Sequence, residues 1–180
     1  MNGRDWLDQA ERADAAAYAA VARTDIPTLD RAMSRLSEAA NYSRLWIGAG
    51  LLLALLGGER GRRAAGDGLA SVAVTATIVN LALKPLGRRP RPERDVLLAR
   101  HVRMPRSRSF PSGHAAAGFA FATGVGETQP GLAVPLRVLA ALVAYSRVHT
   151  GVHFPGDVVF GAALGASLAR ITSRARRRPS

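Results

Sequence analysis

Residues 68–83 read GLASVAVTATIVNLAL, a stretch without a charged side chain. Four more apolar stretches, residues 45–58, 115–126, 131–145 and 158–169, contain a single charge, Arg137. A helix needs about 20 mainly apolar residues to cross a bilayer, so each stretch alone is slightly short. Five of them within about 125 residues, bordered by Arg, Trp, Tyr or Gly that can reach the headgroup level, still predict a membrane protein.

We therefore expect an all-α fold, a polytopic membrane helical bundle with about five transmembrane helices. The alternative is a soluble helical bundle with small-residue packing. The many Gly, Ala and Ser residues within the stretches favour close helix contact in lipid.

The two ends of the chain differ from this middle. Residues 5–23 and 28–40 mix charged side chains with Ala, Leu, Tyr and Met at helical spacing. They predict amphipathic helices on the membrane interface, with a solvated cap as the alternative. The acidic start does not read as a cleavable signal peptide. We divide the chain into N-terminal amphipathic helices (1–44), a membrane domain (45–172) and a basic C-terminal tail (173–180) that holds Arg174, Arg176, Arg177 and Arg178.

The charge of the chain indicates an anionic partner. Its 180 residues fit one domain, and the formal net charge is +12. Of the basic residues, 24 are Arg and only Lys84 is Lys. Such charge is typical of proteins that bind nucleic acid, an anionic membrane surface or a phosphorylated substrate. Because the chain has no Cys, a disulfide framework, a thiolate zinc site and a cysteine nucleophile are excluded.

Residues 84–92, KPLGRRPRP, form the first of three polar segments between the apolar stretches. The three prolines are expected to stop a helix and hold an extended path, along which Lys84 and three arginines present positive charge. The alternative is an ordinary basic loop that contacts lipid headgroups.

The second segment, residues 111–114, reads PSGH and precedes an Ala-rich helical pattern. Pro and Gly place Ser112 and Gly113 at a helix N-terminus, where unsatisfied backbone N–H groups favour an anion such as phosphate. Ser112 adds a hydroxyl donor, and His114 can exchange a proton near neutral pH. The alternative is a plain N-cap at Ser112 with an exposed His114.

The third segment, residues 146–157, reads SRVHTGVHFPGD. His149, His153 and Asp157 are four apart, as metal ligands on one helix face would be, but the glycines and the proline between them argue against a continuous helix. We expect a turn that presents His153 before a new helix, with Asp157 in its first turn. Such a carboxylate fixes the imidazole tautomer and leaves the other ring nitrogen able to attack. His149 has no evident partner and is predicted to be structural or to line the site.

Together these segments resemble the tripartite signature of the type 2 phosphatidic acid phosphatase family. The matching residues are Lys84, then six residues and Arg91-Pro92; Pro111-Ser112-Gly113-His114; and Ser146-Arg147, then five residues, His153, three residues and Asp157. No signature position departs from the pattern, and the only lysine falls on the signature lysine. The usual family architecture has six transmembrane helices, one more than we count.

The resemblance implies a membrane enzyme that hydrolyses a lipid phosphomonoester or pyrophosphate through a phosphohistidine, without a metal ion or cofactor. The expected partners are a lipid phosphate and the bilayer, not nucleic acid. Phosphate oxygens would be held by Lys84, Arg91, Arg147, the Ser112 hydroxyl and the Gly113 N–H. His153 would attack phosphorus with Asp157 holding its ring, and His114 would protonate the leaving oxygen and later activate water.

Five crossings would place the N-terminus and the active-site loops on one side, with residues 59–67 and the C-terminal tail on the other. Outside the signature and Arg137, 13 arginines lie on the first side and 8 on the second. The positive-inside rule then favours a cytoplasmic active site in the plasma membrane.

The nature of the substrate is indicated by arginines near the signature, which favour a headgroup with extra negative charge; they are Arg94, Arg100, Arg103, Arg106 and Arg108. Similarity to small, Arg- and Ala-rich members of the family ranks decaprenylphosphoryl-5-phosphoribose first, a lipid of cell-wall arabinan synthesis. Undecaprenyl pyrophosphate, phosphatidylglycerophosphate and phosphatidic acid are the alternatives.

Two other classes of protein compete with this hypothesis. A non-enzymatic membrane protein that binds anionic lipid or nucleic acid would explain the charge but not a His–Asp pair. A metal-dependent hydrolase would explain His149, His153 and Asp157, but the segment lacks the surrounding carboxylates that such sites use.

Overall fold

The computed structural model describes residues 5–93, 100 and 102–177, and the regular structure of this part is helical throughout, as predicted. The helices are α1 (Asp5–Ala22), α2 (Pro27–Ala39), α3 (Arg44–Leu56), α4 (Gly58–Thr77), α5 (Lys84–Leu86), α6 (Gly113–Thr128), α7 (Ala133–His149) and α8 (Pro155–Arg177). The turns η1 (Asn41–Ser43) and η4 (Pro130–Leu132) precede α3 and α7, and the π-helical η2 (Ile78–Leu83) joins α4 to α5. Arg94 and Arg178 lie outside the described residues.

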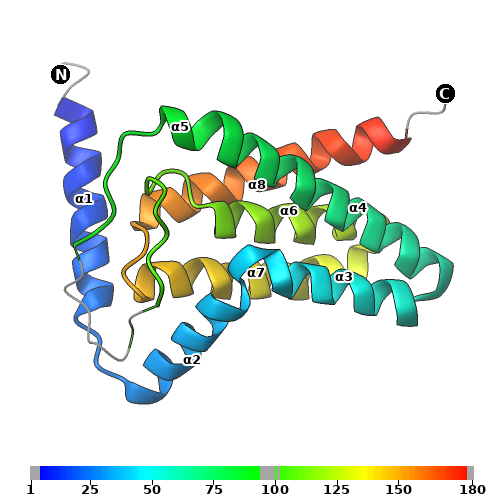
Figure 1. The fold of residues 1–180 in the computed structure, drawn as a ribbon, viewed down its shortest axis with the longest axis horizontal. Coiled ribbons are helices and arrows are strands. Elements are labelled where there is room, and N and C mark those ends of the chain that lie inside the picture. The colour runs from blue at the N-terminus through cyan, green and yellow to red at the C-terminus, as the bar shows by residue number, and fades with distance from the viewer. Residues whose placement is uncertain (1–4, 94–99, 101, 178–180) are drawn as a thin grey trace.

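Helices α3 to α8 form a bundle in which successive long helices run in opposite directions (Figure 1). The start of α6, the end of α7 and the start of α8 lie toward one end of the bundle, together with α5. Helix α1 stands across this end, and the C-terminus lies at the opposite end. The segments that carry the predicted signature therefore meet at the end that α1 covers.

Helix α6 is the centre of the bundle and packs against α4, α7 and α8. It is made largely of Ala and Gly, and most of its residues are buried. Small side chains let neighbouring helices approach closely. On α8, Gly161 and Gly165 lie against the backbone of Ser112 and Ala116, and a Cβ at Gly165 would overlap the Ala116 carbonyl oxygen. This contact fixes the start of α6 beside the first turn of α8.

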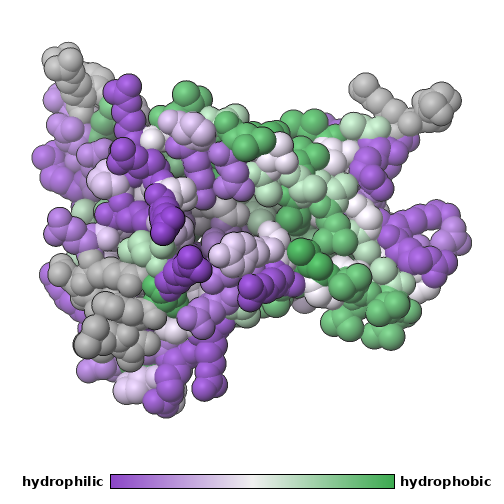
Figure 2. All heavy atoms as spheres, in the orientation of Figure 1, coloured by the Kyte–Doolittle hydropathy of each residue, from purple (hydrophilic) through white to green (hydrophobic). Residues whose placement is uncertain are grey.

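Large apolar side chains face outwards from the bundle, and Figure 2 shows part of this surface between polar side chains at the two ends. Those at least 40% exposed include Leu51, Leu52, Leu55 and Leu56 on α3, Val74, Leu81 and Leu86 from α4 to α5, Val134, Val138 and Leu142 on α7, and Val159, Phe160 and Ile171 on α8. Exposed apolar surface of this extent is typical of contact with lipid or a partner.

The predicted number of transmembrane helices is not confirmed. Two helical stretches are long and apolar enough to cross a membrane, Gly58–Leu86 and Pro130–His149. A third arises if the bent pair Pro27–Ala39 and Asn41–Leu56, with 63° between its halves, is counted as one span. By length and composition alone, α6 is too short to count as a span because it has only 16 residues, and α8 does not count because it carries several arginines toward its end.

Two helix boundaries differ from the sequence prediction. Helix α4 begins at Gly58, so the charged residues 59–67 are helical. The helix also continues through Lys84 and Pro85 to Leu86, although the prolines were expected to stop it. The π-helical η2 directly precedes this turn, and its wider spacing accommodates a residue without a backbone N–H.

The two N-terminal helices pack on the site end of the bundle. Helix α2 contacts α7, and α1 contacts both α7 and α8. Tyr18 of α1 meets Phe154 edge to face, with ring centroids 5.6 Å apart. Helix α2 buries Asp30 and Ser37 beside Met33. Because buried polar groups need hydrogen-bond partners, these two residues point to polar neighbours in the bundle.

Candidate active site

The predicted site residues come from separate segments of the chain. Lys84 starts α5, Arg91 follows it, Ser112, Gly113 and His114 lie at the start of α6, Arg147 is near the end of α7, His153 lies in the turn before α8, and Asp157 is in its first turn. The charges of Arg91 and Arg147 act on both Lys84 and His153, and all four groups act on His114. The structure thus brings these residues together.

His153 is 2% exposed, and its two ring nitrogens have different partners. Nδ1 lies 3.5 Å from Asp157 Oδ2 and 3.4 Å from Ser109 Oγ. Nε2 lies 3.4 Å from Arg91 Nη1. A guanidinium only donates, so Nε2 is the acceptor and the ring proton sits on Nδ1, toward Asp157.

The protonation state of His153 suits a nucleophile. Burial lowers the pKa of His153 to about 4, and the hydrogen bond to Asp157 opposes this only in part. The nearby charges of Arg91 and Arg147 contribute to this lowering. At neutral pH the ring is therefore uncharged and keeps a lone pair on Nε2.

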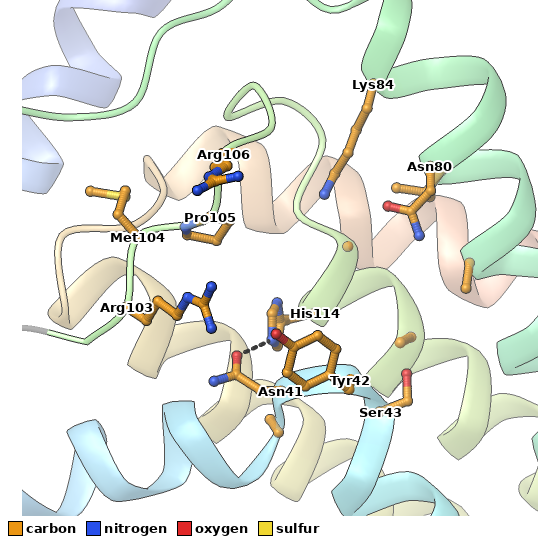
Figure 3. Close-up of a pocket in the computed structure, with 15 residues that line it drawn as sticks. Asn41, Tyr42, Ser43, Asn80, Lys84, Arg103, Met104, Pro105, Arg106 and His114 are labelled. Carbon is orange, nitrogen blue, oxygen red and sulfur yellow. Dashed lines mark hydrogen bonds between the residues drawn. The ribbon is translucent and has the colours of Figure 1, made fainter.

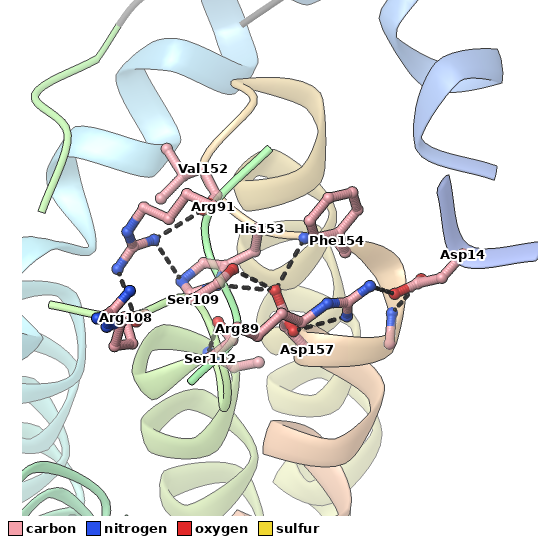
Figure 4. Close-up of polar contacts among 12 residues, drawn as sticks. Asp14, Arg89, Arg91, Arg108, Ser109, Ser112, Val152, His153, Phe154 and Asp157 are labelled. Atoms are coloured by element: carbon pink, nitrogen blue, oxygen red, sulfur yellow. Dashed lines mark hydrogen bonds and ion pairs between the residues drawn. The ribbon is translucent and has the colours of Figure 1, made fainter. Parts of the chain in front are cut away.

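Asp157 is fully buried and holds three groups besides His153 (Figure 4). Its Oδ2 accepts hydrogen bonds from Ser109 Oγ at 2.5 Å and from the Phe154 N–H at 3.0 Å, and its Oδ1 accepts one from Arg89 Nη1 at 3.0 Å. These contacts fix the carboxylate that orients His153. Ser109 was not predicted, since only its place two residues before the PSGH segment hints at a role.

Arg89 connects the site to the N-terminal helix α1. Its guanidinium lies 2.6 Å from Asp14 Oδ2 and 4.2 Å above the Phe154 ring. The other oxygen of Asp14 accepts a hydrogen bond from the Gly156 N–H at the start of α8, at 2.7 Å. Burial lowers the pKa of Arg89, but the hydrogen bond to Asp14 and the charge of Asp157 outweigh burial and raise it. Neither Asp14 nor this role of Arg89 was predicted from sequence.

Lys84 and Arg91 meet at Ser107. Lys84 Nζ donates to Ser107 Oγ at 3.1 Å, and Arg91 Nε donates to the Ser107 carbonyl at 3.0 Å. Arg91 Nη1 also donates to the Val152 carbonyl at 2.7 Å, which ties it to the turn that carries His153. Two cations held this close repel each other, so an anion between them is stabilised.

Arg147 and His114 are held from the side of α2. Arg147 is fully buried, and its Nη1 donates to the hydroxyl of Ser37 at 2.5 Å. His114 Nε2 lies 3.0 Å from Asn41 Oδ1. Ser37 and Asn41 are more than 70 residues from these partners, and no motif in the sequence marked them.

Ser112 acts as the N-cap of α6. Its Oγ accepts a long hydrogen bond of 3.5 Å from the Ala115 N–H, and its own N–H donates to the Asp157 carbonyl at 3.0 Å. These bonds align the starts of α6 and α8. At Gly113 an added Cβ would lie 3.7 Å from Lys84 Nζ, so this lysine is directly beside the helix start.

His149 belongs to a buried ion cluster and does not pair with His153. Its Nε2 lies 2.8 Å from Asp30 Oδ1, and the same carboxylate is 2.8 Å from Arg100 Nε. Arg100 is fully buried and donates to the carbonyls of Val21 and Ala22 at 3.2 Å. The structural interpretation of His149 therefore fits. Arg100, in contrast, was wrongly grouped with arginines that face a headgroup, because Asp30 and the α1 carbonyls bind its guanidinium.

A cavity of about 550 Å³ opens beside the helix start (Figure 3). Lys84, Gly113 and His114 form part of its wall, and Arg103 and Arg106 lie across from Lys84. Its remaining lining includes Ala40, Asn41, Tyr42, Ser43, Ala76, Val79, Asn80, Met104, Pro105 and Ala117. The volume falls in the usual range for small-molecule sites.

The residues present do not form a metal site in the described part of the chain, where no three His, Cys, Asp or Glu side chains gather as ligands would. His149 is bound to Asp30, whereas His153 and Asp157 pair with each other. The metal-ligand interpretation of the four-residue spacing therefore has no geometric support.

Three comparisons with known proteins agree with this geometry. The sequence matches the PAP2 superfamily over residues 67–179. It is 37% identical over 172 residues to the decaprenylphosphoryl-5-phosphoribose phosphatase of Mycobacterium tuberculosis, with 91% of each chain covered. The crystal structure of Aquifex aeolicus LpxE has a TM-score of 0.71 at 25% identity, covering 88% of this chain and 93% of that one.

A transmembrane PAP2-type phosphatidylglycerolphosphate phosphatase from Bacillus subtilis has the same fold, with a TM-score of 0.71 at 24% identity, covering 96% of this chain and 88% of that one. The match across most of the chain confirms the resemblance drawn from the three motifs. The chain belongs to the PAP2 superfamily, and it is a membrane phosphatase that hydrolyses phosphoric monoesters of lipids.

Proposed function

We propose that the chain dephosphorylates decaprenylphosphoryl-5-phosphoribose in the synthesis of cell-wall arabinan precursors. The observation that carries this proposal is the 37% identity, over 91% of the chain, to a protein named for that activity. Arg103 and Arg106 on the cavity wall support a headgroup with more than one negative charge. Undecaprenyl pyrophosphate, phosphatidylglycerophosphate and phosphatidic acid are the alternative substrates.

In the proposed reaction the phosphate lies among Lys84, Arg91 and Arg147. These cations, with the Ser112 hydroxyl and the Gly113 N–H, offset the charge of the transferring phosphoryl group. The repulsion of Lys84 by Arg91 and Arg147 supports this placement of the phosphate. Three cations this close cost free energy unless an anion is bound between them.

His153 Nε2 attacks phosphorus, and the bond from phosphorus to the leaving oxygen breaks. His114 donates a proton to that oxygen, and the product alcohol leaves. His114 then takes a proton from water as the water oxygen attacks phosphorus and releases Nε2. Asp157 stabilises the charge that the ring of His153 gains during attack, and no step needs a metal ion.

We also propose five crossings of the plasma membrane, by α3, α4 with α5, α6, α7 and α8, with the active site on the cytoplasmic side. The alternating directions of these helices and the uneven arginine count support this arrangement. Residues 1–44 would lie at the interface, residues 45–172 in the bilayer and residues 173–180 on the far side. Because the chain has no Cys, the variants Arg62→Cys and Arg88→Cys each carry one cysteine, whose side of the membrane tests this topology. An impermeant maleimide should label only the Arg62→Cys variant in intact cells.

The central test is phosphate release from the four candidate lipids in detergent, by wild type and His153→Ala side by side. Wild type should be most active on decaprenylphosphoryl-5-phosphoribose, with activity retained in excess EDTA, and the variant should be inactive. Release by His153→Ala at the wild-type rate would exclude this histidine as the nucleophile. Loss of wild-type activity in EDTA would exclude a metal-independent reaction.

A further inference from the structure

We propose that the cavity beside His114 is the headgroup subsite, and that Arg103 and Arg106 bind a second phosphate of the substrate, a phosphodiester one sugar ring away from the reacting phosphate. The inference rests on the proposed function and adds the residues that would select the substrate. It also separates these two arginines from the others near the signature.

The positions of His114 and His153 indicate where the leaving group of the substrate lies. In-line displacement puts the nucleophile and the leaving oxygen on opposite sides of phosphorus. His114 and Gly113 line the cavity, whereas His153 is buried beside Arg91 and is absent from the lining. Because His114 is the proposed acid for the leaving oxygen, the cavity takes the alcohol part of the substrate.

The arginines near the site differ in whether another residue binds their side chains. Arg89, Arg100 and Arg147 are bound by carboxylates or by α2, and their charges are used within the protein. Arg103 and Arg106 are exposed and make no hydrogen bond or ion pair with another described residue.

In Figure 3 these two side chains lie across the cavity from Lys84. No Asp or Glu is among the residues that line this cavity. Two guanidinium groups without a carboxylate partner are suited to bidentate binding of phosphate oxygens. Because they lie across the cavity from Lys84, which we place on the reacting phosphate, they fit a second anion better than the first.

Part of the cavity wall is polar but uncharged. Tyr42, Ser43 and Asn80 line this part of the cavity. Tyr42 has φ of 55° and Ser43 has φ of 58°, which is uncommon for residues other than Gly and costly for a bulky side chain. Strained backbone of this kind persists where the surrounding structure requires it, often at ligand sites. An aromatic ring with neighbouring amide and hydroxyl groups is suited to the hydroxyls of a sugar.

The experiment uses two substrates that differ only in the second anion. One is farnesyl phosphoryl-5-phosphoribose, and the other is farnesyl ribofuranoside 5-phosphate, in which a glycosidic bond replaces the phosphodiester. Phosphate release is measured in detergent for wild type, R103Q/R106Q and the control R62Q, an exposed arginine at the far end of α4. Melting temperatures of the three proteins show whether each is folded.

The double variant should raise KM for the diester substrate by about 10-fold to 100-fold and change KM for the glycoside less than about twofold. Inhibition by the product farnesyl phosphoryl ribose should weaken by a similar factor, and R62Q should match wild type. An equal rise in KM on both substrates, or on neither, overturns the inference while the proposed function stands. If wild type releases phosphate from phosphatidic acid but from neither ribose lipid, the proposed substrate fails and the inference fails with it.

Discussion

Arg89→Gln should reduce kcat although Arg89 is not a signature residue. Its guanidinium lies between Asp157 and Asp14, at 3.0 Å and 2.6 Å, and its side chain is 24% exposed. A hydrogen bond to a charged group contributes about 1.5 to 3 kcal/mol, and partial exposure puts this one at the lower end. If about 1.4 kcal/mol of that orients Asp157 in the transition state, kcat falls about tenfold. KM should change less than about twofold, because Arg89 does not reach the cavity.

The assay is steady-state phosphate release in detergent, with Arg88→Gln as the matched control on the exposed neighbour. Arg89→Lys should recover part of kcat because it restores the charge. Asp14→Asn keeps an oxygen for the Gly156 N–H and should lower kcat about threefold, since it acts only through Arg89. The double variant should then resemble Arg89→Gln alone. Unchanged kcat in Arg89→Gln, or a rise in KM as large as the fall in kcat, would refute the positioning role.

Four further predictions concern pH and stability. Because the pKa of His153 is about 4 in the folded protein, kcat/KM should fall only as pH drops through about 4, and an acidic limb centred near 6.5 would contradict this. As the pH falls, His153 is protonated in the unfolded state before it is protonated in the folded state. The free energy of unfolding of the wild type should therefore decrease by about 3 kcal/mol more than that of His153→Ala between pH 6.5 and 4. Gly165→Ala should cost about 1 to 3 kcal/mol and lower Tm because its Cβ overlaps the α6 backbone, whereas Gly131→Ala, with nothing within 4 Å, should leave Tm unchanged. Asp30→Asn should cost about 3 kcal/mol because Arg100 remains buried without its carboxylate, and an unchanged Tm would show that the pair does not stabilise the fold.

The family resemblance predicted which signature residues meet, and the local geometry within a motif could be predicted from the sequence. The turn before α8 follows from Gly and Pro, and Asp157 in the first turn of α8 accepts a hydrogen bond from the Phe154 N–H, which places its carboxylate beside His153. The side chains that hold these groups could not be found in this way. Asp14, Ser37 and Asn41 reach their partners across 73 to 142 residues, so only the packing of the N-terminal part of the chain defines them.

The helix boundaries were harder to predict for a different reason. An apolar stretch marks the part of a helix that contacts apolar surroundings, but it does not mark the residue at which the helix ends. Residues 59–67 are charged and still helical, because exposed charged side chains at a helix end meet water or headgroups. Helix α6 is shorter than a membrane span but lies inside a ring of neighbours, so its length is set by packing. Counting apolar stretches therefore predicted the helices better than the number of spans.

Helix α2 is part of the catalytic unit although it lies outside the region that matches the family, residues 67–179. A helix that only rests on a bundle buries an apolar face, but α2 buries Asp30 and Ser37. Ser37 binds Arg147, one of the three cations of the site, and Asp30 binds His149 two residues further along α7. Buried polar groups of this kind cost free energy unless their partners stay in place, so these contacts stabilise α2 and the end of α7 against each other. The position of Arg147, which we propose binds phosphate, therefore depends on the N-terminal helices as well as on the signature that contains it.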